Sequence, residues 1–299
     1  MRLGTHYILV MRVFALDVGG TKFTVAGFAG DHLVLRESRS TDRAGGPDAL
    51  FSEVQRIFAV WRDEHGFCPD RCGIGFGGPV DFPTQAVTLS THVEGWAQYP
   101  LVANLKTLTG APVVMDNDAN VGALGEAKYG AGRGADPLFY MTLSTGIGGG
   151  IVHGGEIYRG ADSYAGEIGH LNIEPEGPDC LCGSRGCYER MCCGLWLERD
   201  YGKPAHELLQ DEQFVCKYVV HLARGLKAAL MLLNPARVVI GGGISKAGDR
   251  LFVPLREELN RQMTAWSKAR RDVVPAGLQD DSVLYGCLAL ATSGLVSSL

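Results

Sequence analysis

The sequence predicts an α/β fold made of two similar halves, and three observations lead to this prediction. Apolar runs of strand length are separated by longer segments whose apolar residues recur at helical spacing. A strand-like run, a glycine-rich turn and a second strand-like run occur at residues 12–28 and again at 138–155. The 299 residues are 46% hydrophobic and 20% charged, which is typical of a globular protein with one large or two ordinary domains.

The first half begins with two strands joined by a turn. Residues 12–17 form an apolar run that ends in Asp17, and the turn VGGTK leads into a second run at 23–28. Thr24 and Val25 favour a strand over a helix in this second run. A P-loop or a dinucleotide-binding fingerprint has a helix after its glycine turn, so the pattern argues against both.

The rest of the first half alternates helices and strands. Residues 47–62 favour a helix, because Pro47 suits a first turn and apolar residues follow at helical spacing. Short apolar runs at 72–76 and 112–118 predict buried strands. A helix is expected to begin at the end of the second run and to end near Gly130.

The second half repeats this alternation. In order, we expect strands at 138–144 and 151–155, a helix at 212–233, a strand with a glycine turn at 237–245, a helix at 249–266 and a helical tail at 283–299. Because the tail is small and apolar, we expect it to pack back on the first half. The expected domains are therefore residues 1–118 plus 283–299, and residues 119–282.

Charge and hydropathy argue against several kinds of partner. The formal net charge of −5 disfavours general binding to nucleic acids or anionic membranes. No apolar run reaches the length of a membrane span, and the first ten residues carry no signal-peptide pattern. Met11 directly precedes the first strand, so it is an alternative start to Met1. Nine cysteines without a secretory signal are expected in a reducing cytoplasm, where clustered cysteines indicate a metal before a disulfide.

A cluster of cysteines predicts a metal site. Cys180, Cys182 and Cys187 lie within eight residues, and His170 lies ten residues before the first of them. Three thiolates and one imidazole complete a tetrahedral site, so we predict a structural Zn2+ and disfavour a zinc-dependent hydrolase, which needs an open position. The alternative is three reduced loop cysteines that bind nothing. The other cysteines are expected to pack in the core, namely Cys68, Cys72, Cys192, Cys193, Cys216 and Cys287.

Glycine-rich turns predict a nucleotide site. Backbone N–H groups at such turns suit a polyphosphate, because no side chain blocks its approach. Asp17, at the end of the first strand, is the candidate for holding Mg2+ beside the phosphates of a nucleotide. The candidate contacts are Gly19, Gly20, Thr21 and Lys22 in the first turn, Thr145 and Gly146 in the second, and Gly242 and Gly243 in the third. A single glycine turn is more often an ordinary hairpin, but three together favour nucleotide binding.

Carboxylates near these turns are candidates for catalysis and sugar binding. Asp118, at a strand-to-helix junction, suits a general base that accepts a proton from a substrate hydroxyl. The alternative, about equally favoured, is that Asp118 only caps the helix. Glu167 and Glu189 flank the cysteine cluster and, with His170, suit binding of sugar hydroxyls. The alternative for the two glutamates is a solvated surface.

These motifs together resemble the ROK family of bacterial sugar kinases and repressors, from about residue 12 to about residue 292. DVGGTK and STGIGGGI resemble the family's two phosphate motifs, VVIGGGIS its adenosine-side turn and DNDAN its catalytic motif. GEIGH followed by CLCGSRGCYE is the most specific part. The resemblance implies the actin-like/hexokinase ATPase fold, in which two α/β domains with a cleft between them close over MgATP and sugar.

The resemblance also implies roles for particular residues. Asp118 becomes the base and Asn117 a sugar contact, while Gly78 approaches the sugar closely. The implied sugar ligands are Glu167, His170 and Glu189, and the implied zinc ligands are His170, Cys180, Cys182 and Cys187. A homodimer or a homotetramer is implied as well.

The implied activity is ATP-dependent phosphorylation of a hexose 6-hydroxyl, with glucose as the first choice. Glucokinase-like members usually carry an Asn-Leu pair where Thr91 and His92 stand. A kinase for N-acetylmannosamine, N-acetylglucosamine, fructose, mannose or allose is therefore an alternative, and a non-catalytic sugar-sensing ROK protein is another. About eleven residues precede the first strand, so we expect no helix-turn-helix and favour a kinase over a repressor.

Overall fold

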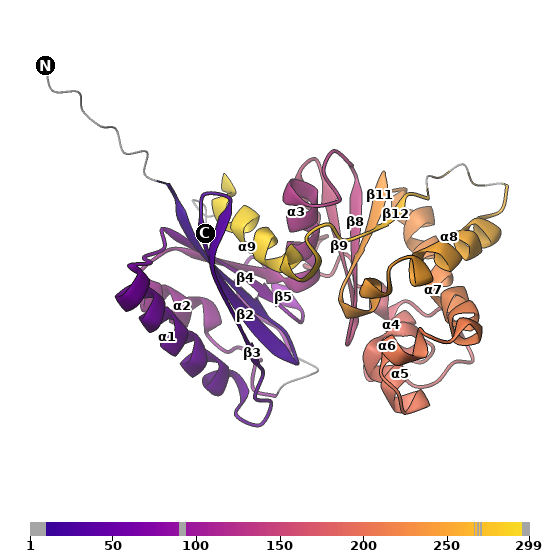
Figure 1. The fold of residues 1–299 in the computed structure, drawn as a ribbon, viewed down its shortest axis with the longest axis horizontal. Coiled ribbons are helices and arrows are strands. Elements are labelled where there is room, and N and C mark those ends of the chain that lie inside the picture. The colour runs from indigo at the N-terminus through magenta and orange to yellow at the C-terminus, as the bar shows by residue number, and fades with distance from the viewer. Residues whose placement is uncertain (1–9, 90–93, 266, 268, 270, 295–299) are drawn as a thin grey trace, which may run out of the picture.

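The computed structural model describes residues 10–89, 94–265, 267, 269 and 271–294, and confirms the α/β fold class. Within these residues, two five-stranded sheets carry helices against their faces, and α3 (Asp118–Tyr129) and α9 (Ser282–Thr292) lie between the sheets (Figure 1). No helix in this part of the chain is long and apolar enough to cross a membrane.

The first sheet has the strand order β3-β2-β1-β4-β7. β1 pairs antiparallel with β2 and parallel with β4, which pairs parallel with β7. Helices α1 and α2 pack on one face, and α9 packs on the other. The bounds are β1 (Arg12–Val18), β2 (Lys22–Ala29), β3 (His32–Ser40), α1 (Gly46–His65), β4 (Arg71–Phe76), α2 (Leu101–Thr109) and β7 (Val113–Asn117). As expected, β2 follows β1 without a helix between them.

The second sheet repeats this topology in the order β10-β9-β8-β11-β12. β8 pairs antiparallel with β9 and parallel with β11, which pairs parallel with β12. Helices α7 and α8 cover one face and α3 the other. The bounds are β8 (Leu138–Leu143), β9 (Ile147–His153), β10 (Glu156–Ile157), α7 (Glu212–Leu233), β11 (Arg237–Gly241), α8 (Asp249–Met263) and β12 (Val273–Pro275). The matching strand orders and directions confirm the internal similarity seen in the sequence.

The connecting segments contain the smaller elements. These are β5 (Val80–Asp81), β6 (Ala86–Val87), η1 (Ile168–His170), α4 (Tyr188–Cys192), α5 (Gly194–Tyr201), α6 (Ala205–Leu208), η2 (Gly243–Ala247) and η3 (Gln279–Asp281). They were not predicted from the sequence, because strands of two residues and helices of eight residues or fewer carry too few positions to show their period.

The two central helices touch each other at glycines. A Cβ added to Gly125 of α3 would lie 2.1 Å from Ser282 O, and a Cβ added to Gly286 of α9 would lie 1.8 Å from Val121 O. Only a residue without a side chain permits this approach at either position. The contact keeps α9 against α3 and the first sheet, as predicted for the apolar tail.

Some predictions were wrong in detail. The helix predicted at 249–266 ends at Met263, and the helix of the tail ends at Thr292, while residues 295–299 lie outside the described residues. Cys68 and Cys216 are exposed instead of packed in the core. The strand β3 was missed because it lies at the edge of its sheet and its polar side chains hide the apolar pattern.

A buried carboxylate joins the two central helices. Glu126 of α3 has a fully buried side chain. Its Oε2 accepts hydrogen bonds from Ala131 N at 2.7 Å and from Gly277 N at 3.0 Å. Its Oε1 accepts from Leu278 N at 2.9 Å and from Ser282 Oγ at 2.7 Å. Glu126 therefore fixes the segment that leads into α9.

We expect Glu126→Ala to lower the free energy of unfolding by about 3–5 kcal/mol, because it leaves buried donors without an acceptor. Glu126→Gln keeps one acceptor oxygen and should lose less. The exposed Glu257→Ala on α8 is the control and should change stability by less than about 0.5 kcal/mol. Urea denaturation measures the free energy of unfolding of all three variants. If Glu126→Ala loses no more than the control Glu257→Ala, the prediction is wrong.

Candidate active site

The first glycine turn joins β1 to β2. Gly19 N donates to Lys22 O at 3.0 Å, which closes the turn. The segment after β3 binds the carbonyl groups of this turn. Thr41 Oγ1 donates to Gly19 O and Arg43 Nε donates to Gly20 O, each at 2.9 Å. Because its carbonyl groups are already bound, the turn is held in shape without a ligand. Thr41 and Arg43 were not predicted from the sequence, because they lie outside the glycine motif.

Acidic side chains converge beside this turn. The pKa of Asp17 is raised to about 7, first by burial and then by the negative charge of Asp118, while Lys22 and Arg36 lower it. Asp280 adds a further negative charge that acts in the same direction as Asp118. Carboxylates that repel one another with little solvent around them suit a divalent cation, which would remove the repulsion.

Asp118 is the first residue of α3, but it does not cap the helix. Asn117 is the N-cap, and its Oδ1 accepts from Ala119 N at 3.0 Å and from Asn120 N at 3.3 Å. Asp118 Oδ1 accepts from Ala119 N at 2.8 Å. Burial raises the pKa of Asp118 to about 7, and the charge of Glu167 raises it too, against the lowering effect of the Ala119 hydrogen bond. This pKa suits a base that works near neutral pH.

Gly77 leaves space between Asp118 and the first turn. A Cβ added to Gly77 would lie 3.5 Å from Asp118 Oδ2 and 3.6 Å from the Cα of Gly19. Gly77 N donates to Val18 O at 2.8 Å, which ties the ends of β1 and β4 together. The sequence prediction named its neighbour Gly78 instead, although the run GFGGPV contained the signal for both.

The second turn lies close to the same helix end. Ser144 N donates to Gly146 O at 3.0 Å, so Thr145 is at the tip of a closed turn. Gly194 N, at the start of α5, donates to Ser144 O at 2.7 Å. A Cβ added to Gly148, just beyond the turn, would lie 3.1 Å from Cβ of Ala119. The start of α3 therefore packs directly beside the second turn.

The third turn follows β11 and rests against the end of β8. Gly242 has a φ of 88°, and a Cβ there would lie 2.5 Å from Leu143 O. Both the left-handed backbone and the lack of space require glycine at this position. At Gly243 an added Cβ would meet no atom within 4 Å, so that residue faces open space.

Of the predicted sugar-binding residues, Glu167 lies near enough to Asp118 for its charge to raise the pKa of that carboxylate. Burial raises the pKa of Glu167, His170 lowers it and Glu189 raises it, so these three groups act on one another. Glu189 Oε2 accepts from Ile147 N at 2.8 Å, which ties α4 to the start of β9. Its other oxygen and the Glu167 carboxylate are acceptors that this region offers to a ligand, while the exposed His170 ring has an N–H to donate if its other nitrogen binds a metal.

Asn117 has only one group left for a ligand. Its Oδ1 caps α3, and its Nδ2 donates to Gly78 O at 3.0 Å. An amide nitrogen carries two hydrogens, so one N–H remains.

The unusual segment with Thr91 and His92 lies outside the described residues.

The four predicted zinc ligands come together. The ligand atoms of His170, Cys180, Cys182 and Cys187 lie within 4.8 Å of one another. The Sγ atoms of Cys182 and Cys187 are 3.6 Å apart, whereas two thiolates on one tetrahedral zinc are separated by about 3.8 Å. Gly186 has a φ of 61°, and an added Cβ would lie 1.7 Å from Glu174 O, so only glycine allows this loop. The donor set and its spacing fit zinc.

Known proteins are similar to this chain over nearly its whole length. Residues 13–293 match the ROK family. A glucokinase from Thermotoga maritima is 32% identical over 309 aligned positions, which cover 94% of this chain and 97% of that protein.

Solved structures are similar over nearly the whole chain. The ROK hexokinase from Thermus thermophilus has a TM-score of 0.80 at 32% identity. The alignment with it covers 94% of this chain and 98% of that one. A ROK family glucokinase from Streptomyces griseus, in complex with glucose and AMPPNP, has a TM-score of 0.81 at 27% identity. The alignment with it covers 95% of this chain and 100% of that one. The predicted actin-like/hexokinase ATPase fold is thereby confirmed.

Proposed function

Because this chain belongs to the ROK family, we propose that it transfers the γ-phosphoryl group of ATP to the 6-hydroxyl of a hexose, with glucose preferred. The observation that carries this proposal is the position of Asp118. Its partly buried carboxylate faces the first phosphate turn across Gly77, and the charge of Glu167, a proposed sugar ligand, raises its pKa. A base between a phosphate turn and a set of hydroxyl acceptors is the arrangement that phosphorylation of a sugar requires.

In the proposed reaction, Asp118 Oδ2 accepts the proton of the 6-hydroxyl while the hydroxyl oxygen attacks the γ-phosphorus. The bond from that phosphorus to the oxygen bridging the β- and γ-phosphates breaks, and ADP leaves. The first turn (Gly19, Gly20, Thr21 and Lys22) and the second turn (Thr145 and Gly146) bind phosphates, while Gly242 and Gly243 border the adenosine. Asp17 would hold Mg2+, which neutralises developing charge on the phosphates when bound.

The sugar is proposed to lie among Asn117, Gly78, Glu167, His170 and Glu189. A structural zinc held by His170, Cys180, Cys182 and Cys187 would fix the loop between Glu167 and Glu189. A ring nitrogen on a metal leaves the second nitrogen of His170 with one defined direction for a hydrogen bond. The protein's own contribution is therefore orientation of the sugar hydroxyls toward Asp118.

We also propose how the whole molecule is arranged. Residues 1–118 plus 283–299 and residues 119–282 are the two domains that close over ATP and sugar. The enzyme is proposed to work in the cytoplasm as a homodimer or homotetramer, without nucleic acid or membrane as a partner.

The test is release of ADP with Mg2+ and ATP across glucose, fructose, mannose, allose, N-acetylglucosamine and N-acetylmannosamine. Highest kcat/KM on glucose is the expected result. Higher kcat/KM on another sugar would replace glucose as the substrate but keep the reaction class. If no sugar is phosphorylated while calorimetry detects sugar binding, the chain is a sensor instead of a kinase.

Turnover should depend on pH through Asp118. The carboxylate acts in its ionised form, and its pKa is about 7, so the active fraction decreases as pH falls through 7. At saturating MgATP we expect kcat/KM for glucose to fall about tenfold per pH unit well below pH 7, and to level off above it. Direct detection of ADP between about pH 5.5 and 8.5 measures this profile, and a flat profile would contradict the role of Asp118 as base.

A further inference from the structure

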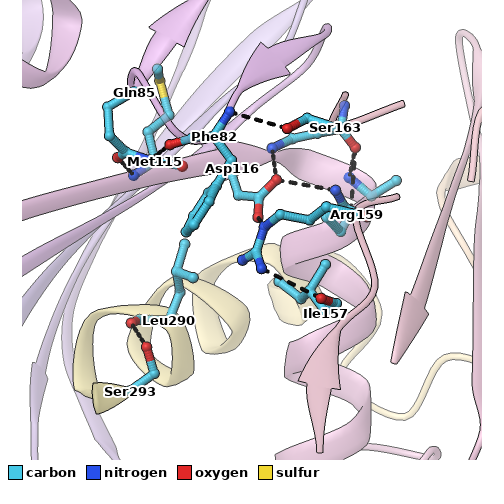
Figure 2. Close-up of polar contacts among 12 residues, drawn as sticks. Phe82, Gln85, Met115, Asp116, Ile157, Arg159, Ser163, Leu290 and Ser293 are labelled. Atoms are coloured by element: carbon cyan, nitrogen blue, oxygen red, sulfur yellow. Dashed lines mark hydrogen bonds and ion pairs between the residues drawn. The ribbon is translucent and has the colours of Figure 1, made fainter. Parts of the chain in front are cut away.

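Arg159 connects the two halves of the molecule through Asp116 (Figure 2). It lies just after β10 of the second sheet, and its Nε donates to Asp116 Oδ2 of β7, in the first sheet, at 2.7 Å. The side chains of Arg159 and Asp116 are only 16% and 1% exposed. Breaking a buried ion pair leaves an uncompensated charge, so this contact strongly constrains both segments.

Asp116 in turn holds the start of α3. Its Oδ1 accepts from Asn117 N at 2.7 Å and from Asn120 Nδ2 at 3.1 Å. Asn117 caps α3, and Asp118 is the first residue of that helix. The Asp116 carboxylate thus links Arg159 to the backbone that places the proposed base.

The flat face of Arg159 packs on the β5–β6 hairpin. The carbon of its guanidinium group lies 3.6 Å from the centre of the Phe82 ring, and Phe82 N donates to Ser163 Oγ at 3.3 Å. Gln85 binds the same hairpin to β7, since its Nε2 donates to Met115 O at 3.1 Å and its Oε1 accepts from Met115 N at 2.7 Å. Figure 2 shows the Phe82 ring beside the guanidinium group, with Gln85 and Met115 next to them.

These contacts reach both sides of the proposed sugar site. The β5–β6 hairpin begins two residues after Gly78, whose carbonyl oxygen Asn117 binds. The segment that carries Arg159 and Ser163 continues to Glu167, the proposed sugar acceptor. A shift of Arg159 would therefore move the base and the sugar-binding segments relative to one another.

We propose that Arg159 is a positioning residue of the sugar site, which acts through Asp116 and Phe82. This inference rests on the proposed function. A guanidinium group donates in its plane and stacks with its face at the same time, whereas a lysine ammonium does not. Because a misplacement of about 1 Å can cost about 10²-fold in rate, Arg159 should affect sugar turnover more than ATP binding.

The experiment compares the variants Arg159→Lys and Arg159→Met with wild type. For Arg159→Met we expect kcat/KM for glucose to fall about 10²-fold, with KM for ATP changed less than about threefold. Arg159→Lys keeps the charge and should lose about tenfold, because the stacking and the planar donor are gone. Arg237→Lys is the matched control, since Arg237 forms an ion pair of the same length with Asp272 away from this site, and it should leave both constants unchanged.

A double variant separates positioning from folding. Arg159→Met alone should lower the melting temperature by roughly 5–10 °C, because it leaves Asp116 buried and unpaired. Asp116→Asn combined with Arg159→Met removes both charges, and the amide oxygen of the new side chain would still accept hydrogen bonds at the start of α3. We expect this double variant to regain most of the melting temperature but not the lost kcat/KM for glucose.

Wild-type kcat/KM for glucose in the double variant would overturn the inference. A KM for ATP that rises by the same factor as kcat/KM for glucose falls would overturn it as well. The activity of the wild type tests the proposed function separately. The inference about Arg159 depends only on the ratio of kcat/KM between each variant and the wild type. If wild type binds glucose without turnover, the comparison uses Kd from calorimetry. A Kd for glucose that is the same in wild type and in the double variant would then overturn the inference.

Discussion

Asp118→Asn is expected to lower kcat by about 10²–10⁴-fold while KM for glucose changes by less than about threefold. The amide has nearly the shape of the carboxylate, and its oxygen can still accept the hydrogen bond from Ala119 N. It cannot accept a proton from the 6-hydroxyl at neutral pH, so the loss falls on the chemical step. Steady-state ADP release over a range of glucose and ATP concentrations measures both constants.

The control for this variant is Asp63→Asn, which changes an exposed aspartate at the end of α1 and should leave kcat unchanged. Near-normal turnover in Asp118→Asn would show that another group accepts the proton. Because Asn117 already caps α3, a structural role as N-cap does not account for a loss of activity at position 118. A large rise in KM for glucose with an unchanged kcat would point to sugar binding as the role of Asp118.

Removal of the zinc site is expected to have the second large effect. Wild-type protein should contain about one zinc per chain, and Cys187→Ser should lose it. We expect the free energy of unfolding to fall by roughly 5 kcal/mol or more, because the loop loses the ion that holds its ligands together. KM for glucose should rise more than KM for ATP, since His170 and the segment between Glu167 and Glu189 belong to the proposed sugar site.

Cys216→Ser provides the matched control, because Cys216 is an exposed cysteine on α7 outside the cluster. It should keep its zinc, its stability and both KM values. Elemental analysis, urea denaturation and steady-state kinetics measure the three properties. Metal-free wild type that keeps full stability and activity would show that the four residues bind no structural zinc.

Sequence alone predicted the repeated halves and the central strands of both sheets, but it missed α2 and the edge strands β3, β10 and β12. The helix α7 was predicted with its observed bounds, because a continuous apolar stripe runs to Asn234 and Pro235, which end it. The hairpin β1–β2 was predicted from β-branched residues after a glycine turn. The cluster of His170, Cys180, Cys182 and Cys187 was predicted because these residues lie close in sequence, so their density is visible without a fold.

The sequence could not separate two roles for Asp118, base or helix cap. A helix start predicted to within a few residues does not say which side chain turns back to bind the backbone. Only the structure shows that Asn117 does so, while Asp118 Oδ2 faces the gap at Gly77.

What the sequence determined by itself is therefore local: the period of each element, the glycine turns and the cluster of three cysteines and one histidine. The contacts made by Glu126 and Arg159 were decided by the tertiary structure, because their partners lie far away along the chain. A single carboxylate or guanidinium group in a sequence has no visible partner. Burial makes these contacts important for stability. A charged group that is removed from water is stabilised only by the few polar groups that folding brings next to it.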